Sequence, residues 1–159
     1  MKIEDAINQR KFLSEHHKAL LNIVYTSGQL LGVNTRLLKP FNISQQQFNI
    51  LRILRGMHPK PATVKLLTER MLDKMSNASR LVEKLKQKGL VERITAEDDR
   101  RRVDISITES GLQTVNEASV IIENDIRSME KALNEEEAQM LNTLLDKLRE
   151  YENMKGKED

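Results

Sequence analysis

Apolar and polar positions follow a helical period along most of the chain and a strand period in one place. Apolar residues recur every three to four positions, which predicts amphipathic helices. The exception is a pair of short segments: Leu90–Ile94 is partly β-branched, and Val103, Ile105 and Ile107 alternate with polar residues. Such alternation is typical of a strand with one buried face. The pattern therefore predicts a mainly α fold with one small β-hairpin.

Local signals mark the helix boundaries. The first helix is predicted over residues 3 to about 38, with an apolar stripe from Leu13 to Leu31 and a break at Pro40. Ser44 and Gln47 match a capping box that starts the next helix. Thr63 and Thr108 are expected to cap two further helices, and Gly89 to end the helix that precedes the hairpin. Asn134 and Glu137 match a second capping box. It starts a final helix whose inward side chains are expected to be Leu141, Leu144, Leu145, Leu148 and Tyr151.

The helix before the hairpin has one apolar stripe, formed by Leu81, Val82 and Leu85, and many polar residues elsewhere. The hairpin connection, residues 96–102, contains three consecutive arginines and no Asn-Gly or Asp-Gly pair. It is therefore predicted to be a longer loop rather than a two-residue turn. A polar helix followed by a basic hairpin is typical of a recognition helix with a wing.

Positions on both sides of this hairpin carry a family resemblance. They are Ser79, Arg80, Leu81, Val82, Leu85, Gly89, Leu90, Val91, Arg93, Asp99, Arg101, Val103, Ile107, Thr108 and Gly111. The stretch resembles the winged helix-turn-helix of the multiple antibiotic resistance regulator (MarR) family. The resemblance implies a homodimer whose wing arginine, Arg101, enters the DNA minor groove. It also implies a small aromatic or phenolic effector between dimer body and winged lobe, nearest to Tyr25, Gly28, Phe41, Phe48 and Met57.

Composition and charge narrow the function classes. The 159 residues include no Cys, which excludes disulfides, thiolate metal sites and thiol-based redox sensing. No apolar run approaches the ~20 residues that a membrane span needs, so a cytoplasmic protein is expected. The net charge is only +2, but it is +5 over residues 1–59, +4 over residues 60–108 and −7 over residues 109–159. A cationic first part is expected where one face meets phosphate.

The polar residues at the start of the recognition helix have two interpretations. They could serve only as caps, with Asp73 the expected cap and Ser76 the alternative. They could instead face bases and phosphates in the major groove, with Asn77 pairing with adenine and Lys84 with a phosphate. The candidate DNA-binding residues of this helix are Lys74, Ser76, Asn77, Ser79, Arg80 and Lys84.

The wing candidates are Asp99, Arg100, Arg101 and Arg102. Three adjacent arginines could form a solvated turn that neighbouring carboxylates balance. On a projecting hairpin, however, they fit the negative potential of a narrow minor groove, and Asp99 could orient the Arg101 guanidinium. We expect Arg101 to be the inserted side chain.

No catalytic or metal-binding pattern accompanies these features in the sequence. His16 and His17 would point about a hundred degrees apart on a helix, and neither they nor His58 has further ligands one turn away. Nucleophile motifs and Gly-rich phosphate fingerprints do not occur. We therefore expect no enzyme, no cofactor and no metal site.

These observations predict a single MarR-type domain over residues 1–159, with N- and C-terminal dimerisation helices. Residues 44–108 are expected to form the DNA-binding lobe, and residues 1–40 and 109–155 the dimerisation body, because their apolar stripes exceed what a small winged core can bury. The expected function is a ligand-responsive homodimeric repressor of a pseudo-palindromic operator in double-stranded DNA. The alternative is a winged-helix interaction module whose basic wing binds an acidic protein partner.

Overall fold

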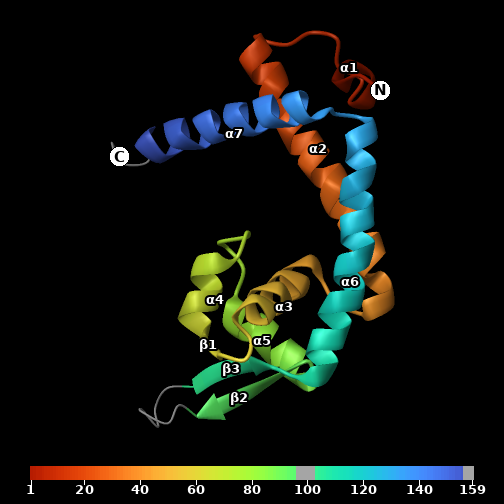
Figure 1. The fold of residues 1–159 in the computed structure, drawn as a ribbon. Coiled ribbons are helices and arrows are strands. Elements are labelled where there is room, and N and C mark those ends of the chain that lie inside the picture. Colours follow the sequence, from red (N-terminus) through yellow and green to blue (C-terminus); the bar gives the residue numbers. More distant parts are fainter. Residues whose placement is uncertain (96–102, 156–159) are drawn as a thin grey trace. The chain divides into compact units, whose positions relative to one another are not determined.

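The structure is a computed structural model that describes residues 1–95 and 103–155, most of them helical (Figure 1). The wing candidates Asp99–Arg102 lie outside the described residues. The chain divides into two compact units, Met1–Ser119 and Val120–Asp159. The elements in chain order are α1 (Ile3–Ala6), α2 (Glu15–Leu38), η1 (Lys39–Phe41), α3 (Gln45–Met57), β1 (Ala62–Thr63), α4 (Val64–Arg70), α5 (Ala78–Gln87), β2 (Val91–Thr95), β3 (Val103–Ile107), α6 (Glu109–Ser128), η2 (Met129–Lys131) and α7 (Glu135–Lys155).

A three-stranded antiparallel sheet in the order β1-β3-β2 forms one side of the first unit, with α3, α4 and α5 against it (Figure 1). The predicted hairpin is confirmed, with Val91 opposite Ile107. The sequence did not predict β1, because a two-residue strand shows no periodicity. Since β1 pairs with β3, the latter is the central strand, and Asp104, expected on its solvent face, is only 8% exposed.

The core of the first unit is aliphatic, and α3 crosses it. The capping box that starts α3 is confirmed: Ser44 Oγ accepts from Gln47 N at 3.2 Å, and Gln47 Oε1 accepts from Ser44 N at 3.1 Å. Burial of each large apolar side chain stabilises the fold by roughly 1.5–3 kcal/mol. The largest fully buried side chains are Leu38, Ile50, Leu51, Leu54, Leu67, Met71, Val82, Leu85, Ile105 and Val115.

The start of α6 lies directly against the end of the recognition segment. Gly89 has φ +71° and ends α5 as predicted. Thr108 Oγ1 donates to the Gly89 carbonyl at 2.7 Å and accepts from Gly111 N at 3.0 Å, which confirms Thr108 as a cap. A Cβ atom on Gly111 would lie 2.0 Å from the Leu90 carbonyl oxygen. Helix α6 can therefore approach the start of β2 only with glycine at this position.

The first helix is shorter than predicted, because α2 begins at Glu15 rather than at residue 3. Ser14 Oγ accepts from His17 N at 3.2 Å, and this cap starts the helix. The preceding residues fold back as the short α1, which Lys18 holds by donating to Glu4 Oε1 at 2.5 Å. The Lys18 ammonium lowers the pKa of the Glu4 carboxyl, and the carboxylate raises the pKa of Lys18.

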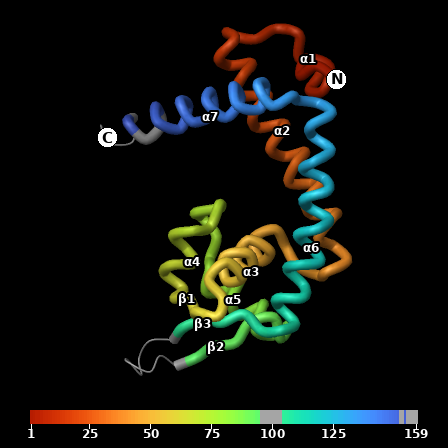
Figure 2. Tube along the Cα trace, in the orientation of Figure 1, coloured from red at the N-terminus to blue at the C-terminus, as the bar shows by residue number. Residues whose placement is uncertain are grey.

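Helix α2 leads to α3 through η1, where the chain changes direction (Figure 2). The break falls at Pro40, as predicted. Asn42 follows with φ +53° and donates its backbone N–H to the Lys39 carbonyl at 3.0 Å. This left-handed residue ends η1 and sets the direction from which α3 starts.

The second unit consists of the end of α6, η2 and α7. Its predicted capping box is confirmed: Asn134 Oδ1 accepts from Glu137 N at 3.0 Å, and Glu137 Oε2 accepts from Asn134 N at 2.9 Å. The preceding helix, α6, ends at Ser128, and the 3-10 turn η2 follows. Most of the α7 residues predicted to face inward are exposed in the single chain, namely Leu141, Leu144, Leu148 and Tyr151.

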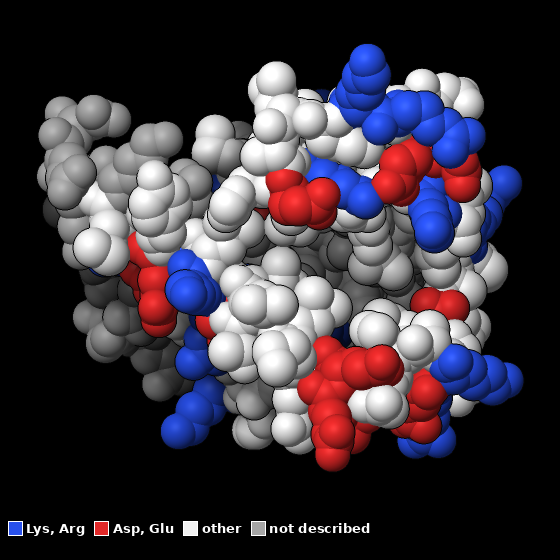
Figure 3. All heavy atoms as spheres, turned by 90° about the horizontal axis from the view of Figure 1, so that it is seen from above, with Lys and Arg blue, Asp and Glu red and all other residues white. Residues whose placement is uncertain are grey.

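On the face drawn in Figure 3, acidic and basic side chains form small groups separated by uncharged surface. Within the described part of the chain, no helix is both long and apolar enough to cross a membrane. Nor do His, Asp and Glu side chains of the described residues gather in threes as metal ligands would.

Candidate nucleic-acid interface

Helix α5 has a buried face and a solvent face of different chemistry. Ala78, Val82 and Leu85 are 4% exposed or less and pack into the core beside α3 and α4. Ser79, Arg80, Lys84, Lys86 and Gln87 are exposed. The apolar stripe predicted for this helix is confirmed in Val82 and Leu85, while Leu81 is half-buried. Helix α5 therefore presents short polar and cationic side chains to solvent from a fixed position.

The N-cap of α5 is Asn77, so the prediction of Asp73 is wrong, and so is its alternative Ser76. Asn77 Oδ1 accepts from Arg80 N at 3.0 Å. Asp73 instead closes a local turn: Oδ1 accepts from Met75 N at 3.0 Å and Oδ2 from Ser76 Oγ at 2.6 Å. The Ser76 hydrogen bond is the main reason that the pKa of Asp73 lies below its usual value. Because residues 73–76 form this turn, helix α5 begins only at Ala78.

Capping limits what Asn77 can do to a base. A bidentate contact with adenine uses the amide oxygen as acceptor and the amide nitrogen as donor. The oxygen already accepts from Arg80 N, so a bidentate contact would compete with the cap. The capping interpretation of Asn77 is thus correct, and a base contact through its amide nitrogen stays a prediction.

The turn between α4 and α5 is held without glycine. Leu72 N donates to Asn49 Oδ1 of α3 at 3.0 Å, and Lys74 Nζ donates to the Glu69 carbonyl. Leu72 is 78% exposed and Met75 94% exposed. The two bonds fix the turn from both sides, so its geometry does not depend on a left-handed residue. Lys74, a predicted DNA contact, is thereby drawn toward α4.

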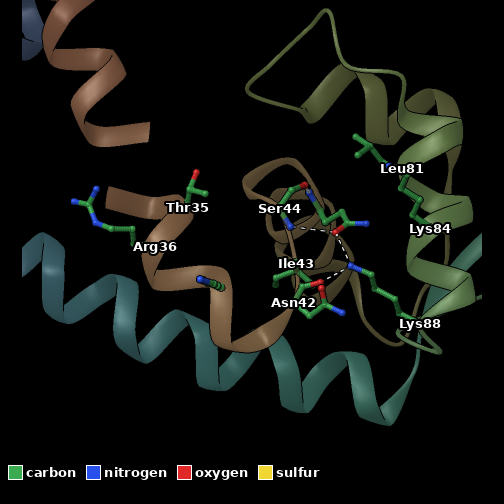
Figure 4. A pocket seen from close by; sticks show the side chains of 10 residues that line it. Thr35, Arg36, Asn42, Ile43, Ser44, Leu81, Lys84 and Lys88 are labelled. Carbon is green, nitrogen blue, oxygen red and sulfur yellow. Dashed lines mark hydrogen bonds between the residues drawn. The ribbon is translucent and has the colours of Figure 1, made fainter. Parts of the chain in front are cut away.

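The other end of α5 is tied to the α2–α3 corner by Lys88 (Figure 4). Lys88 Nζ donates to Gln47 Oε1 at 3.2 Å and to the Asn42 carbonyl. Gln47 Oε1 also takes part in the α3 capping box, so one amide oxygen connects the two helices. Sequence reasoning did not identify Lys88, because its partners lie more than forty positions away in the chain.

The described part of the hairpin carries one cross-element ion pair. Arg93 of β2 contacts Glu83 of α5 at 3.1 Å, with both side chains partly exposed. Exposed pairs of this kind contribute about 0–1 kcal/mol, so the pair orients Arg93 more than it stabilises the fold. The four wing candidates, Asp99 to Arg102, lie outside the described residues, and their role stays a prediction.

The five residues predicted to surround an effector do not share one environment. Gly28 is exposed on α2, Phe48 is buried at 5% exposure, and Tyr25, Phe41 and Met57 are half-buried. Two hollows of the first unit are lined by other residues, one between the α2–α3 corner and α5, the other beside the turn before α5. The predicted effector position is therefore untested.

Residues 41–102, which include α3 to β2, match the sequence profile of the MarR family. The organohalide-sensing RdhR transcriptional regulator, solved with 2,4-dichlorophenol bound, has a similar fold: the TM-score is 0.78, with 26% identity over 87% of this chain and 82% of that one. The chain is thus similar to the MarR family of winged helix-turn-helix transcription regulators, in sequence over residues 41–102 and in fold over most of its length. The predicted fold class is thereby confirmed.

Two further proteins extend the comparison. The transcriptional repressor IacR of Pseudomonas putida is 26% identical over 111 residues, which span 70% of this chain and 65% of IacR, slightly less than two thirds of its length. The MepR–DNA complex of S. aureus has the same fold at 21% identity, with a TM-score of 0.71 over 82% of this chain and 94% of MepR.

Proposed function

We propose that this protein is a member of the MarR family, namely a sequence-specific, double-stranded-DNA-binding regulator that acts as a ligand-responsive homodimeric repressor in the cytoplasm. The observation that carries the proposal is the polar solvent face of α5, held rigidly by a buried apolar face, by the Asn77 cap and by Lys88. Ser79 can reach base edges, and Arg80 and Lys84 suit phosphates. The wing arginines would extend the contact into the minor groove.

Dimerisation is supported by apolar surface that the single chain leaves exposed. Leu20, Val24 and Leu31 of α2 are 49% exposed or more, as are several residues of α6 and α7. Helices with many exposed large apolar side chains are typical of a protein interface. We propose that residues 1–40 and 109–155 form the dimer body within a single domain and that residues 44–108 carry the DNA-binding surface, so that the two α5 helices meet successive turns of one duplex.

The repressor role is supported by the similarity of this chain to the transcriptional repressor IacR. An aromatic effector is supported by its similarity to RdhR, which was solved with 2,4-dichlorophenol bound. Selection of bound sequences from random duplex DNA tests the proposal directly. It should return a pseudo-palindromic consensus with half-sites about one helical turn, ~10 bp, apart. Recovery of unenriched sequences at every salt concentration would overturn it and favour the protein-interaction module.

A further inference from the structure

Arg55, near the end of α3, connects that helix to α6. Its Nη1 atom donates to Asn116 Oδ1 at 3.0 Å and to Ser119 Oγ at 2.9 Å. The two acceptors are neutral and lie about one helical turn apart on α6, so a single guanidinium holds one face of that helix. Arg55, Asn116 and Ser119 are called the Arg55 bridge below.

The Arg55 bridge lies where α6 leaves the core of the first unit. Val115 and Ala118 are fully buried and Ser119 is 6% exposed, whereas Val120 is 58% exposed. Ser119 is the last buried residue of α6 and also the last residue of the first unit. The bridge therefore holds α6 at the point where its burial ends.

The start of α6 is fixed by other contacts. Gly111 lies close to the Leu90 carbonyl, and Thr108 caps the helix. From Gly111 to Ser119 the helix rises roughly 12 Å, and two fixed points that far apart determine the direction of a straight rod. Apolar packing between these points has no preferred direction, whereas hydrogen bonds are directional. The direction in which α6 leaves the DNA-binding lobe thus depends on the Arg55 bridge.

We propose that Arg55 is a positioning residue that sets the half-site spacing at which two DNA-binding lobes bind one duplex. This inference rests on the proposed function, because only a dimer on a two-part site has a spacing. One base pair more or less between the half-sites moves the second half-site by about 3.4 Å and turns it by about 35° around the duplex. A lobe held in one direction by Arg55 accepts one spacing, and a lobe that can tilt on α6 accepts several.

Affinity for duplexes of different spacing tests the proposal. The selected half-sites are placed at the preferred spacing, one base pair closer and one base pair further apart. The variant is Arg55→Met, which keeps a long side chain and removes the hydrogen-bond donors. The matched control is Arg52→Met, which removes the same charge from the same helix, where the Arg52 guanidinium lies 5.9 Å from the centroid of the Phe48 ring.

Wild type and Arg52→Met should lose at least tenfold in affinity at each altered spacing, and Arg55→Met less than threefold. On a single half-site the two variants should agree within twofold, since Arg55 acts on the spacing and not on the bases. Equal discrimination by the two variants, or an equal loss by Arg55→Met at every spacing, would overturn the proposal.

Asn116→Asp changes the bridge in the opposite direction. A carboxylate accepts a stronger, charge-assisted hydrogen bond from Arg55 than the amide does, and position 116 is exposed. This variant should discriminate between spacings at least as strongly as the wild type. A weaker discrimination would contradict the role of the bridge.

A measurement without DNA separates the Arg55 bridge from the proposed function. The chain has no Cys, so Lys65→Cys on α4 and Glu123→Cys on α6, both exposed, take spin labels at these two positions alone. Labelled chains are diluted with unlabelled wild type, and pulsed electron paramagnetic resonance then measures the distance within one chain. The distance distribution should be wider with Arg55→Met than with Arg52→Met or without either change.

The two arms distinguish the possible failures. Equal distribution widths in Arg55→Met and Arg52→Met would overturn the inference and leave operator binding untouched. If selection enriches no duplex, the proposed function fails and the spacing role fails with it, whereas the label distances still report whether Arg55 fixes α6.

Discussion

Helices α5 and α7 are both amphipathic, but the apolar stripe of α5 is buried within its own unit, whereas several apolar side chains of α7 are exposed. Val82 and Leu85 of α5 are fully buried, whereas Leu144 and Leu148 of α7 are 56% and 42% exposed. An apolar stripe alone therefore does not say what will cover it. For α5 the cover is α3 and α4, and for α7 we propose a second copy of the chain.

The two helices also differ in charge. Residues 60–108, which contain α5, have a net charge of +4, and residues 109–159, which contain α7, have −7. At long range, the negative charge of phosphate thus attracts the α5 region and repels the α7 region. This difference supports DNA contact by the α5 region rather than by the α7 region.

The largest effect is expected where α5 meets the core. Leu85→Ala should lower the free energy of unfolding by about 2–5 kcal/mol, because it leaves a cavity at a fully buried site. Urea unfolding measures it, and the loss should not depend on protein concentration. Lys86→Ala on the exposed face is the control and should change stability by less than about 0.5 kcal/mol. Similar values for the two variants would mean that α5 is not anchored as described.

Leu144→Glu should act on association instead. A charge on the exposed α7 stripe should weaken dimerisation by about 2–3 kcal/mol, roughly 100-fold, through loss of an apolar contact and burial of a charge. Sedimentation equilibrium at micromolar concentration should show the wild type as a dimer and the variant shifted toward monomer. Lys147→Ala, also exposed on α7, should leave the dimer intact. A monomeric wild type would remove the difference between the two helices.

Two substitutions of Asn77 distinguish a capping role from a role in base recognition. Asn77→Ala should cost about 1 kcal/mol of stability, and Asn77→Ser almost none, because serine is an equally good cap. If the amide nitrogen also contacts a base, both variants should lose about 1 kcal/mol per half-site on the operator and nothing on random DNA. Operator affinity of Asn77→Ser equal to that of the wild type would leave Asn77 as a cap only.

Lys84→Ala should weaken binding to operator and random duplex alike. Its side chain is exposed on the solvent face of α5 and suits a phosphate, so the salt slope should fall by about one ion per subunit. Affinities at several salt concentrations measure it, with Lys147→Ala as the matched control on α7. A loss confined to the operator would assign Lys84 to a base rather than to the backbone.

The smallest expected effect is the pH dependence of the stability that Asp73 contributes. The pKa of Asp73 is lowered by hydrogen bonds from Ser76 Oγ and Met75 N, so its stabilising contribution is complete above the ordinary value of 3.8 and disappears as pH falls through the lowered pKa. The stability difference between wild type and Asp73→Ala should therefore be constant near neutrality and shrink in acid. The exposed Glu123→Ala is the control. A difference that persists at the lowest pH would show that the carboxylate charge is not what holds the turn.

Elements with signals in neighbouring residues could be predicted from the sequence. The Ser44–Gln47 and Asn134–Glu137 boxes and the Gly89 stop each depend on local hydrogen bonds or a single φ angle, and all three are confirmed. The predictions that were missed or wrong concern features that depend on distant partners or on competition between neighbouring residues. Strand β1 exists only through β3, and the Asp73 turn displaces the expected start of α5 to Asn77.

The candidate site likewise has features that were predictable from local sequence and features that were not. The exposed polar face of α5 was predictable from its period, because its apolar stripe fixes which residues point outward. The tie of Lys88 to Asn42 and Gln47 was not predictable, since these residues belong to elements that lie far apart in the sequence and that the fold brings together. The predicted effector position near Tyr25, Gly28, Phe41, Phe48 and Met57 stays a prediction.

The central claim is that two copies of α5, joined through α7 and α2, read one duplex. Sedimentation equilibrium of the protein on the selected duplex tests it most directly, with a half-site duplex and a scrambled duplex alongside. We predict two chains per full duplex, with affinity at least 10³ above that for scrambled DNA. One chain per duplex at saturation, or equal affinity for the selected and scrambled sequences, would contradict the account.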